Sequence, residues 1–117
     1  MATRTATTSN PPRLRSKLFS WDALAATSSD VGSAVEVLGY SALLFSVRSG
    51  GTYAAGSGAT LQLQGSHDGS YWFNLLAPIV TPVDTTTAVT ASVLPRYVRP
   101  RIAGGTTTII NVDCLAR

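Results

Sequence analysis

The chain has 117 residues, a length that accommodates one domain. Its hydrophobic fraction of 44% is ordinary, but its charged fraction of 13% is about half the usual share. A single cysteine excludes an internal disulfide and a metal site built from several cysteines. We expect so weakly charged a surface to be covered in part by another chain. No apolar run reaches the length of a membrane span and no signal-peptide core is present, so we expect folding in a cytoplasm and no membrane partner.

The first 17 residues differ in composition from the rest. They contain no acidic residue and few apolar ones, which predicts a flexible, extended arm (1–17) in front of a folded domain (18–117). The arm holds four of the nine positive charges, and the remaining five face six acidic residues, so the body is close to neutral. This favours a tether to an acidic surface of protein or nucleic acid, with a solvated tail as the alternative. The candidate contact residues of the arm are Arg4, Pro11, Pro12, Arg13, Arg15 and Lys17.

Short strands and turns follow the arm. Residues 22–27 could form a short helix, whereas 31–38 and 40–48 are typical of strands separated by Gly39, and 49–51 form a turn. Residues 61–64 alternate apolar and polar side chains, Asp68-Gly69 supplies a tight turn, and 71–75 return as the partner strand, which together predict a hairpin. The two prolines of 77–82 indicate an edge strand or a connection.

The last third of the chain continues this pattern. Residues 85–94 are β-branched, 96–102 and 106–115 alternate, and Gly104-Gly105 predicts a tight hairpin turn between the last two. About eight strands with short turns and no long amphipathic helix indicate an all-β fold. We expect an antiparallel β-sandwich with a jelly-roll-like or immunoglobulin-like topology.

Few residues point to chemistry. His67-Asp68 falls at the hairpin tip, where turn formation explains the aspartate and no second catalytic group accompanies the histidine. Cys114 lies in a strand-like run and is interpreted as a small buried thiol rather than a nucleophile. The six carboxylates are scattered singly, and no phosphate-binding or calcium-loop motif occurs. We therefore expect no enzymatic activity, no small-molecule substrate, no metal and no cofactor.

Aromatic and basic residues allow one further interpretation. Arg99 and Arg101 share a strand face with Tyr97, and with Arg96 they form a candidate protein-interaction strip. With Trp72 they could instead bind sugars or single-stranded nucleic acid. We favour Trp72 as a core anchor between two sheets, because tryptophan is usually largely buried.

The segments 61–72 and 96–106 together resemble small β-sandwich virion proteins of tailed bacteriophages. The resemblance lies in a strand followed by Gly65-Ser66-His67-Asp68-Gly69-Ser70-Tyr71-Trp72, and in the late strand Arg96-Tyr97-Val98-Arg99 ending at Gly104-Gly105-Thr106. It covers roughly residues 58–115. Pro100 departs from the usual filler of the late strand, which indicates that this strand lies at an edge.

The resemblance implies a capsid decoration (cement) protein on the outer surface of the phage head, made in the host cytoplasm. Its implied partners are the major capsid protein and further copies of itself, with trimers at threefold positions. The alternative is a tail, baseplate or fibre module that binds cell-surface carbohydrate, marked by a solvent-exposed Trp72 or Tyr53. A nucleic-acid-binding protein is less favoured because the body is near neutral, and an enzyme is least favoured.

Overall fold

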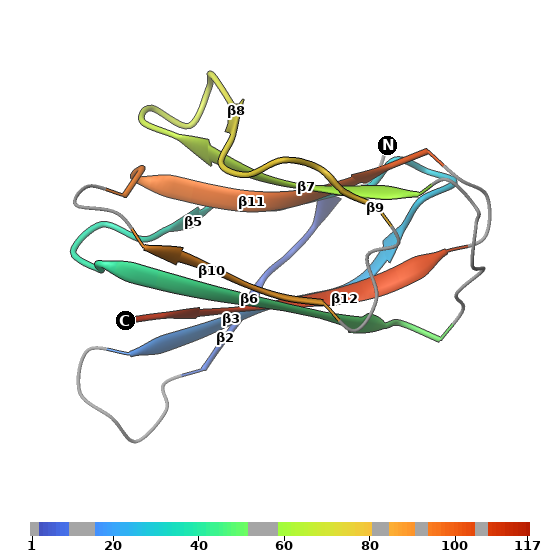
Figure 1. Ribbon diagram of the computed structural model, residues 1–117, viewed down its shortest axis with the longest axis horizontal. Coiled ribbons are helices and arrows are strands. Elements are labelled where there is room, and N and C mark those ends of the chain that lie inside the picture. Colours follow the sequence, from blue (N-terminus) through green and yellow to red (C-terminus); the bar gives the residue numbers. More distant parts are fainter. Residues whose placement is uncertain (1–2, 10–15, 52–58, 81–84, 91–93, 105–107) are drawn as a thin grey trace.

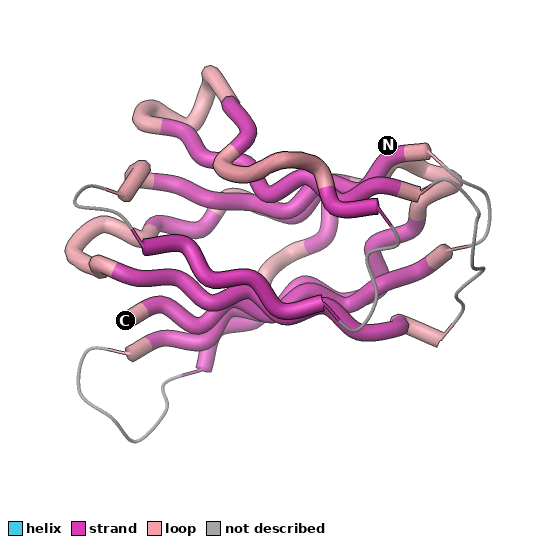
Figure 2. The backbone as a smooth tube through the Cα atoms, in the orientation of Figure 1, coloured by secondary structure: helices cyan, strands magenta, loops and turns pink. Residues whose placement is uncertain are grey.

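Two β-sheets pack face to face in the computed structural model, which describes residues 3–9, 16–51, 59–80, 85–90, 94–104 and 108–117. Figures 1 and 2 show the two layers of strands, with connections running between them at both ends. The described residues contain strands, turns and bends but no helix. No helix that is long and apolar enough to cross a membrane is therefore present among the described residues. The prediction of an all-β sandwich is confirmed.

The first sheet, called sheet A, is centred on β11. Its strand order is β1-β4-β11-β7-β8, with β5 also paired to β11 and β9 also paired to β7. The long β11–β7 pairing is antiparallel, whereas the short β1–β4 pairing is parallel. The strands are β1 (Thr3–Arg4), β4 (Val31–Gly32), β5 (Val35–Glu36), β7 (Thr60–Ser66), β8 (Phe73–Asn74), β9 (Ile79–Val80) and β11 (Tyr97–Ala103).

The second sheet, called sheet B, has the order β10-β6-β12-β3-β2. All of its strand pairs are antiparallel, and β12 lies between β6 and β3. The strands are β2 (Thr7–Ser9), β3 (Lys17–Ala25), β6 (Ala42–Ser49), β10 (Thr85–Thr90) and β12 (Ile109–Ala116).

The core lies between the sheets and is made by the inward half of each alternating strand. On β11 and β12 every second residue is buried, as the period of two requires. Burying each large apolar side chain contributes about 1.5–3 kcal/mol, so these residues hold the two sheets together. The largest apolar side chains that are at most 1% exposed are Trp21, Leu24, Val37, Leu43, Phe45, Leu61, Leu63, Val98, Ile102, Ile110 and Val112.

The structure corrects the prediction of a flexible arm for part of its length. Thr3–Arg4 pairs with Val31–Gly32 in sheet A, and Thr7–Ser9 pairs with residues of β3 in sheet B. Backbone hydrogen bonds to the neighbouring strands hold this segment in place, although its polar side chains bury little apolar surface. The sandwich therefore begins before residue 18, and the N-terminal segment spans both sheets. Residues 10–15 lie outside the described residues.

Two local predictions also differ from the structure. Residues 22–27 do not form a helix, because β3 continues to Ala25 through a bulge opposite Ile110 and Val112. Ala23 takes a φ of 59° there, and its N–H donates to Oδ1 of Asn111 at 2.9 Å. The segment at Gly104 does not close a hairpin either, because β11 belongs to sheet A and β12 to sheet B.

The strand that carries Pro100 is central rather than at an edge. Pro100 pairs with Leu63 of β7 on one side. On the other side the neighbour is interrupted between β4 and β5, so proline removes no ladder hydrogen bond there. Its ring lies against Gly32, where an added Cβ would come within 2.6 Å of Cδ of Pro100. The missing side chain at Gly32 makes room for a proline in the middle of the sheet.

Candidate functional site

The outward face of β11 carries the strongest candidate site. Tyr97, Arg99 and Arg101 are half-buried, while the residues between them point into the core. Arg99 lies opposite Gln64 of β7, and Arg101 lies opposite Gln62. Residues directly opposite each other in an antiparallel pair share a face, so arginines and glutamines form a polar surface across the middle of sheet A. We call this surface the arginine face.

Arg99 is held by two contacts. Its guanidinium carbon lies 4.0 Å from the ring centroid of Trp72, a cation–π stack. Its Nε donates a hydrogen bond to Oε1 of Gln64 at 2.9 Å. Burial, and then the nearby charge of Arg101, lower the pKa of Arg99 from its ordinary value. Both contacts leave the terminal amino groups of the side chain available to a ligand.

Arg101 lies two residues from Arg99 on β11, and neither has an acidic partner among the described residues. Nε of Arg101 is buried and has no hydrogen-bond partner among the described residues. The same part of the chain contains three ion pairs, and none of them involves Arg99 or Arg101. Arg96, by contrast, pairs with Glu36 at 3.1 Å and lies 5.2 Å from the ring centroid of Tyr97. Within the part of the chain that the structure describes, the predicted strip thus divides into one arginine that is paired with a carboxylate and two that are not.

Trp72 is not the core anchor that the sequence favoured. It is half-buried on the surface under Arg99, whereas Trp21 is fully buried between the sheets. Nε1 of Trp21 donates to the backbone oxygen of Ser33 at 3.0 Å, which satisfies the only polar atom of the buried ring. The sequence did carry this signal, because Trp21 alternates with Phe19 within a strand while Trp72 directly follows a turn.

The loop between β7 and β8 presents the aromatic side chains. Oδ1 of Asp68 accepts hydrogen bonds from the backbone N–H groups of Ser70 at 2.8 Å and Tyr71 at 3.0 Å. These two amides, first Tyr71 and then Ser70, are the main reason that the pKa of Asp68 is lowered. Gly69 has a φ of 82°, which suits the turn. The hairpin and the structural role of Asp68 are confirmed, and Tyr71 is 74% exposed at the tip.

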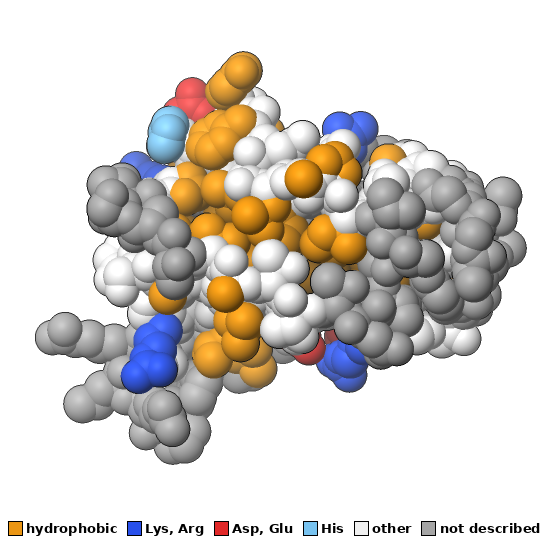
Figure 3. Space-filling view, viewed as in Figure 1, with side chains coloured by type: hydrophobic (Ala, Val, Ile, Leu, Met, Phe, Trp, Pro, Cys, Tyr) orange, Lys and Arg blue, Asp and Glu red, His pale blue; other side chains and the backbone are white. Residues whose placement is uncertain are grey.

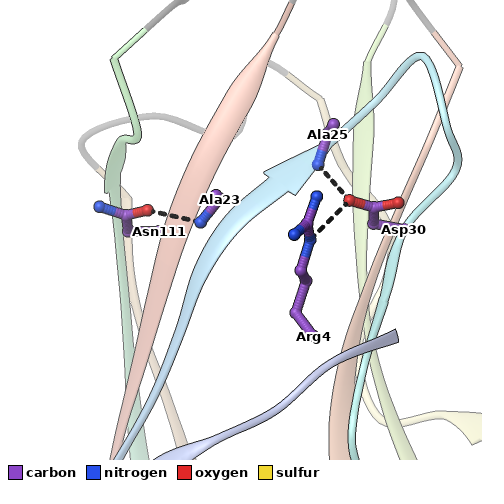
Figure 4. A network of polar contacts seen from close by, with 5 residues as sticks. All are labelled: Arg4, Ala23, Ala25, Asp30 and Asn111. Carbon is purple, nitrogen blue, oxygen red and sulfur yellow. Dashed lines mark hydrogen bonds and ion pairs between the residues drawn. The ribbon is translucent and has the colours of Figure 1, made fainter. Parts of the chain in front are cut away.

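The N-terminal segment is fixed to the body by a buried carboxylate (Figure 4). Oδ2 of Asp30 accepts a hydrogen bond from Nε of Arg4 at 3.2 Å and from the backbone N–H of Ala25 at 3.0 Å. The side chain of Asp30 is fully buried, and that of Arg4 is 43% exposed. Arg4, proposed from the sequence as a partner contact, is therefore engaged within the chain.

The other candidate contact residues of the arm lie apart from this network. Lys17 begins β3 and is exposed. Pro11, Pro12, Arg13 and Arg15 lie outside the described residues.

The outer face of sheet B carries a row of apolar side chains, next to the ion pair between Arg48 and Asp113. Leu44 lies opposite Leu115, Leu115 lies opposite Leu18, and Ala88 lies opposite Leu44 on the other side. We call these four residues the leucine row. Leu44 is 41% exposed and the two other leucines are half-buried. Three members of the row, Leu44, Ala88 and Leu115, line an apolar depression together with Ala42, Leu43 and Arg117.

The side of the sandwich seen in Figure 3 is also poor in charge. Hydrophobic and uncharged side chains fill the middle of this view, and charged side chains lie toward its margins. Partly buried apolar side chains pack against the core in the described region, among them Tyr40, Leu75, Leu76, Ile79, Val89 and Leu94.

The remaining ionisable groups have structural surroundings. Burial raises the pKa of the Cys114 thiol to about 12, which agrees with the prediction of a buried structural cysteine. Asp113 pairs with Arg48 at 3.3 Å. Among the residues that the structure describes, no group of three or more histidine, cysteine, aspartate or glutamate side chains could hold a metal ion.

Comparisons with known proteins agree on the fold. No family model matches the chain, and no curated protein matches it in sequence. The crystal structure of the SPBc2 prophage-derived protein YomS is similar, with a TM-score of 0.62 and 12% identity over 92% of this chain and 100% of that chain. The K2 cleaved adhesin domain of Lys-gingipain has a TM-score of 0.53 and 9% identity over 96% of this chain and 70% of that chain. At such identities the likeness shows a shared β-sandwich, a fold used by structural and binding modules.

Proposed function

We propose that the chain is a non-enzymatic structural protein of a bacteriophage virion, a capsid decoration protein that binds the outside of the head and stabilises the shell. The observation that carries the proposal is the leucine row on the outer face of sheet B. Its apolar side chains are aligned across the four adjacent strands β10, β6, β12 and β3, and covering their exposed surface with a second protein surface lowers the free energy. The similarity in fold to a prophage-derived protein supports the same assignment.

The proposed partners are the major capsid protein and further copies of this chain, with a trimer as the expected assembly. The leucine row provides an apolar contact surface on sheet B. Arg96, Arg99 and Arg101 provide polar contacts on the side of sheet A. Lys17, Arg13 and Arg15 remain proposed contacts to acidic capsid surfaces. A protein with two dissimilar faces can contact a shell subunit through one and a neighbouring copy through the other. Nucleic acid is not a proposed partner, because the chain outside the first 17 residues is near neutral.

The copy number of the chain in purified particles tests the proposal. Quantitative mass spectrometry should give a ratio to the major capsid protein near one or a simple fraction. Substitution of Leu44 by glutamate should weaken co-sedimentation with particles lacking the chain by about ten-fold or more, because it buries a charge in an apolar contact. The matched control is Leu38→Glu, since Leu38 is 65% exposed but lies in a turn outside the leucine row. Absence of the chain from particles would overturn the assignment.

A second function has its own supporting observation. Tyr71 is 74% exposed beside the half-buried Trp72, and exposed aromatic rings are common in carbohydrate-binding surfaces. The alternative is therefore a tail, baseplate or fibre module that binds cell-surface carbohydrate. It predicts a handful of copies per particle and a change in tryptophan emission on adding host glycan. It also predicts that Tyr71→Ala abolishes adsorption to cells while leaving the particle composition unchanged.

A further inference from the structure

The arginine face has an unbalanced charge in the middle of a sheet. Arg99 and Arg101 lie two residues apart on β11, a separation of about 7 Å along a strand. Two like charges at that distance repel each other, and partial burial reduces the screening by water. Elsewhere in the described chain, Arg4, Arg48 and Arg96 each pair with a carboxylate. The two arginines at the centre of sheet A differ from these because no described carboxylate pairs with them.

The side chain of Arg99 is already held in place. Stacking on Trp72 and the hydrogen bond from Nε to Gln64 restrict its torsions without using its terminal amino groups. An arginine held in this way loses little conformational entropy when it binds a ligand. Guanidinium groups match carboxylates in shape, because two parallel N–H groups meet two oxygens. The surface is thus arranged to receive an anion with two coplanar oxygens.

We propose that Arg99 and Arg101 form a binding site for carboxylate side chains of an acidic protein segment. The segment lies across the middle of sheet A, with one carboxylate on Arg99 and the next on Arg101. Gln62, which is half-buried opposite Arg101, supplies an amide group for the backbone of the bound segment, while the buried Gln64 holds Arg99 in place. The inference rests on the proposed function, and it specifies that the arginine face binds carboxylate groups of the partner protein.

An acidic peptide fits this site better than an acidic sugar does. Sugar binding uses the open face of an aromatic ring, and the guanidinium of Arg99 occupies one face of Trp72. A carboxylate on a peptide needs only the free edge of the guanidinium. The charge complementarity is with a partner that carries several acidic residues close together, since a single carboxylate would neutralise one arginine of the two.

A direct binding assay with the full chain tests the site. The probe is a short fluorescein-labelled oligoglutamate peptide, with binding followed by fluorescence anisotropy at low and at physiological salt. Arg99→Gln and Arg101→Gln should each weaken binding by about ten-fold or more. Arg99→Lys should lose most of the affinity as well, because lysine keeps the charge but not the paired N–H groups. Thermal unfolding of each variant shows whether it is folded.

A matched control separates a site from general attraction. Arg48→Gln removes the same charge from an arginine that pairs with Asp113 in sheet B, so it should change the affinity less than about two-fold. If all three glutamine variants bind equally weakly, net charge explains the binding and the site does not exist. If polygalacturonate binds through Arg99 and Arg101 while oligoglutamate does not, the ligand is an acidic sugar and the proposal is wrong. Absence of oligoglutamate binding at low salt would also overturn it, without affecting the sedimentation test of Leu44.

Discussion

The ion pair between Arg4 and Asp30 provides a quantitative test of how the N-terminal segment is attached. Asp30 is fully buried and accepts hydrogen bonds from Arg4 and from the backbone of Ala25. If these contacts fix β1 to the sandwich, removing either side chain should lower the free energy of unfolding. The change should also be larger than the change caused by breaking an exposed ion pair of similar length.

The expected magnitudes follow from burial. A hydrogen bond to a charged group is worth about 1.5–3 kcal/mol, so Asp30→Ala, which removes at least the bonds from Arg4 and Ala25, should cost about 3–4 kcal/mol or more after allowance for solvation of the freed arginine. Arg4→Ala leaves the carboxylate buried with one donor fewer and should cost about 2 kcal/mol, since Arg4 is 43% exposed and its charge is partly screened. In the double variant the two costs should overlap by about 1–2 kcal/mol. Arg96→Ala breaks the exposed pair with Glu36 at 3.1 Å and should cost about 0.5 kcal/mol or less.

Urea unfolding followed by circular dichroism gives all four free energies, and thermal unfolding should show a decrease of about 4 °C per kcal/mol. Arg96→Ala is the matched control, because it removes an arginine whose Nε lies as close to a carboxylate as that of Arg4. Equal effects of Arg4→Ala and Arg96→Ala would refute the argument from burial. Additive effects of Arg4→Ala and Asp30→Ala would show that the two side chains do not interact in solution.

Three further predictions concern single positions. Gly32→Ala should cost about 2 kcal/mol or more in urea unfolding, because its Cβ would lie 2.6 Å from Cδ of Pro100, and adding Pro100→Ala should recover part of that loss. Cys114 should not react with Ellman's reagent at pH 8 in the folded protein and should react once guanidinium unfolds it. Because the folded pKa of about 12 exceeds the ordinary 9.0, stability should fall as the pH rises above 9. Asp68→Ala should speed chymotrypsin cleavage after Tyr71, because it removes the acceptor of the Ser70 and Tyr71 amides; cleavage that is equally slow in both proteins would contradict this role of Asp68.

The sequence predicted the strands whose alternation is set by burial on one side. The strand at 109–116 and the hairpin around Asp68 were predicted correctly. Successive side chains of a strand point to opposite faces, so burial of one face produces an alternation that is visible in the sequence. The helix expected at 22–27 was wrong because a bulge at Ala23 interrupts the period of two. The pattern also gives no information on which sheet a strand joins, so β11 and β12 were expected to pair and do not.

The candidate site shows a different limit of sequence reasoning. Parity along β11 correctly placed Arg99 and Arg101 on one face, because that relation is local. Their lack of acidic partners could not be foreseen, since each ion pair in the described chain joins residues far apart in sequence. For the same reason, composition predicted a free arm where Thr3–Arg4 and Thr7–Ser9 are strands. Edge pairing depends on the backbone, and the composition of a segment says little about it.

Integration of the N-terminal segment changes how a capsid-binding arm must be tested. Deleting residues 1–17 would remove β1 and β2 and the ion pair to Asp30, so weaker particle binding by that variant could result from misfolding alone. Charge removal at Lys17, which is exposed at the start of β3, keeps every strand in place. If the arm contributes to binding, Lys17→Gln should weaken particle binding, and added salt should weaken the binding of the unchanged chain in the same way. The free energy of unfolding of the variant should be unchanged. The two outer faces make the larger contribution in this view, because the leucine row and the arginine face are built on the central strands that the core holds rigid.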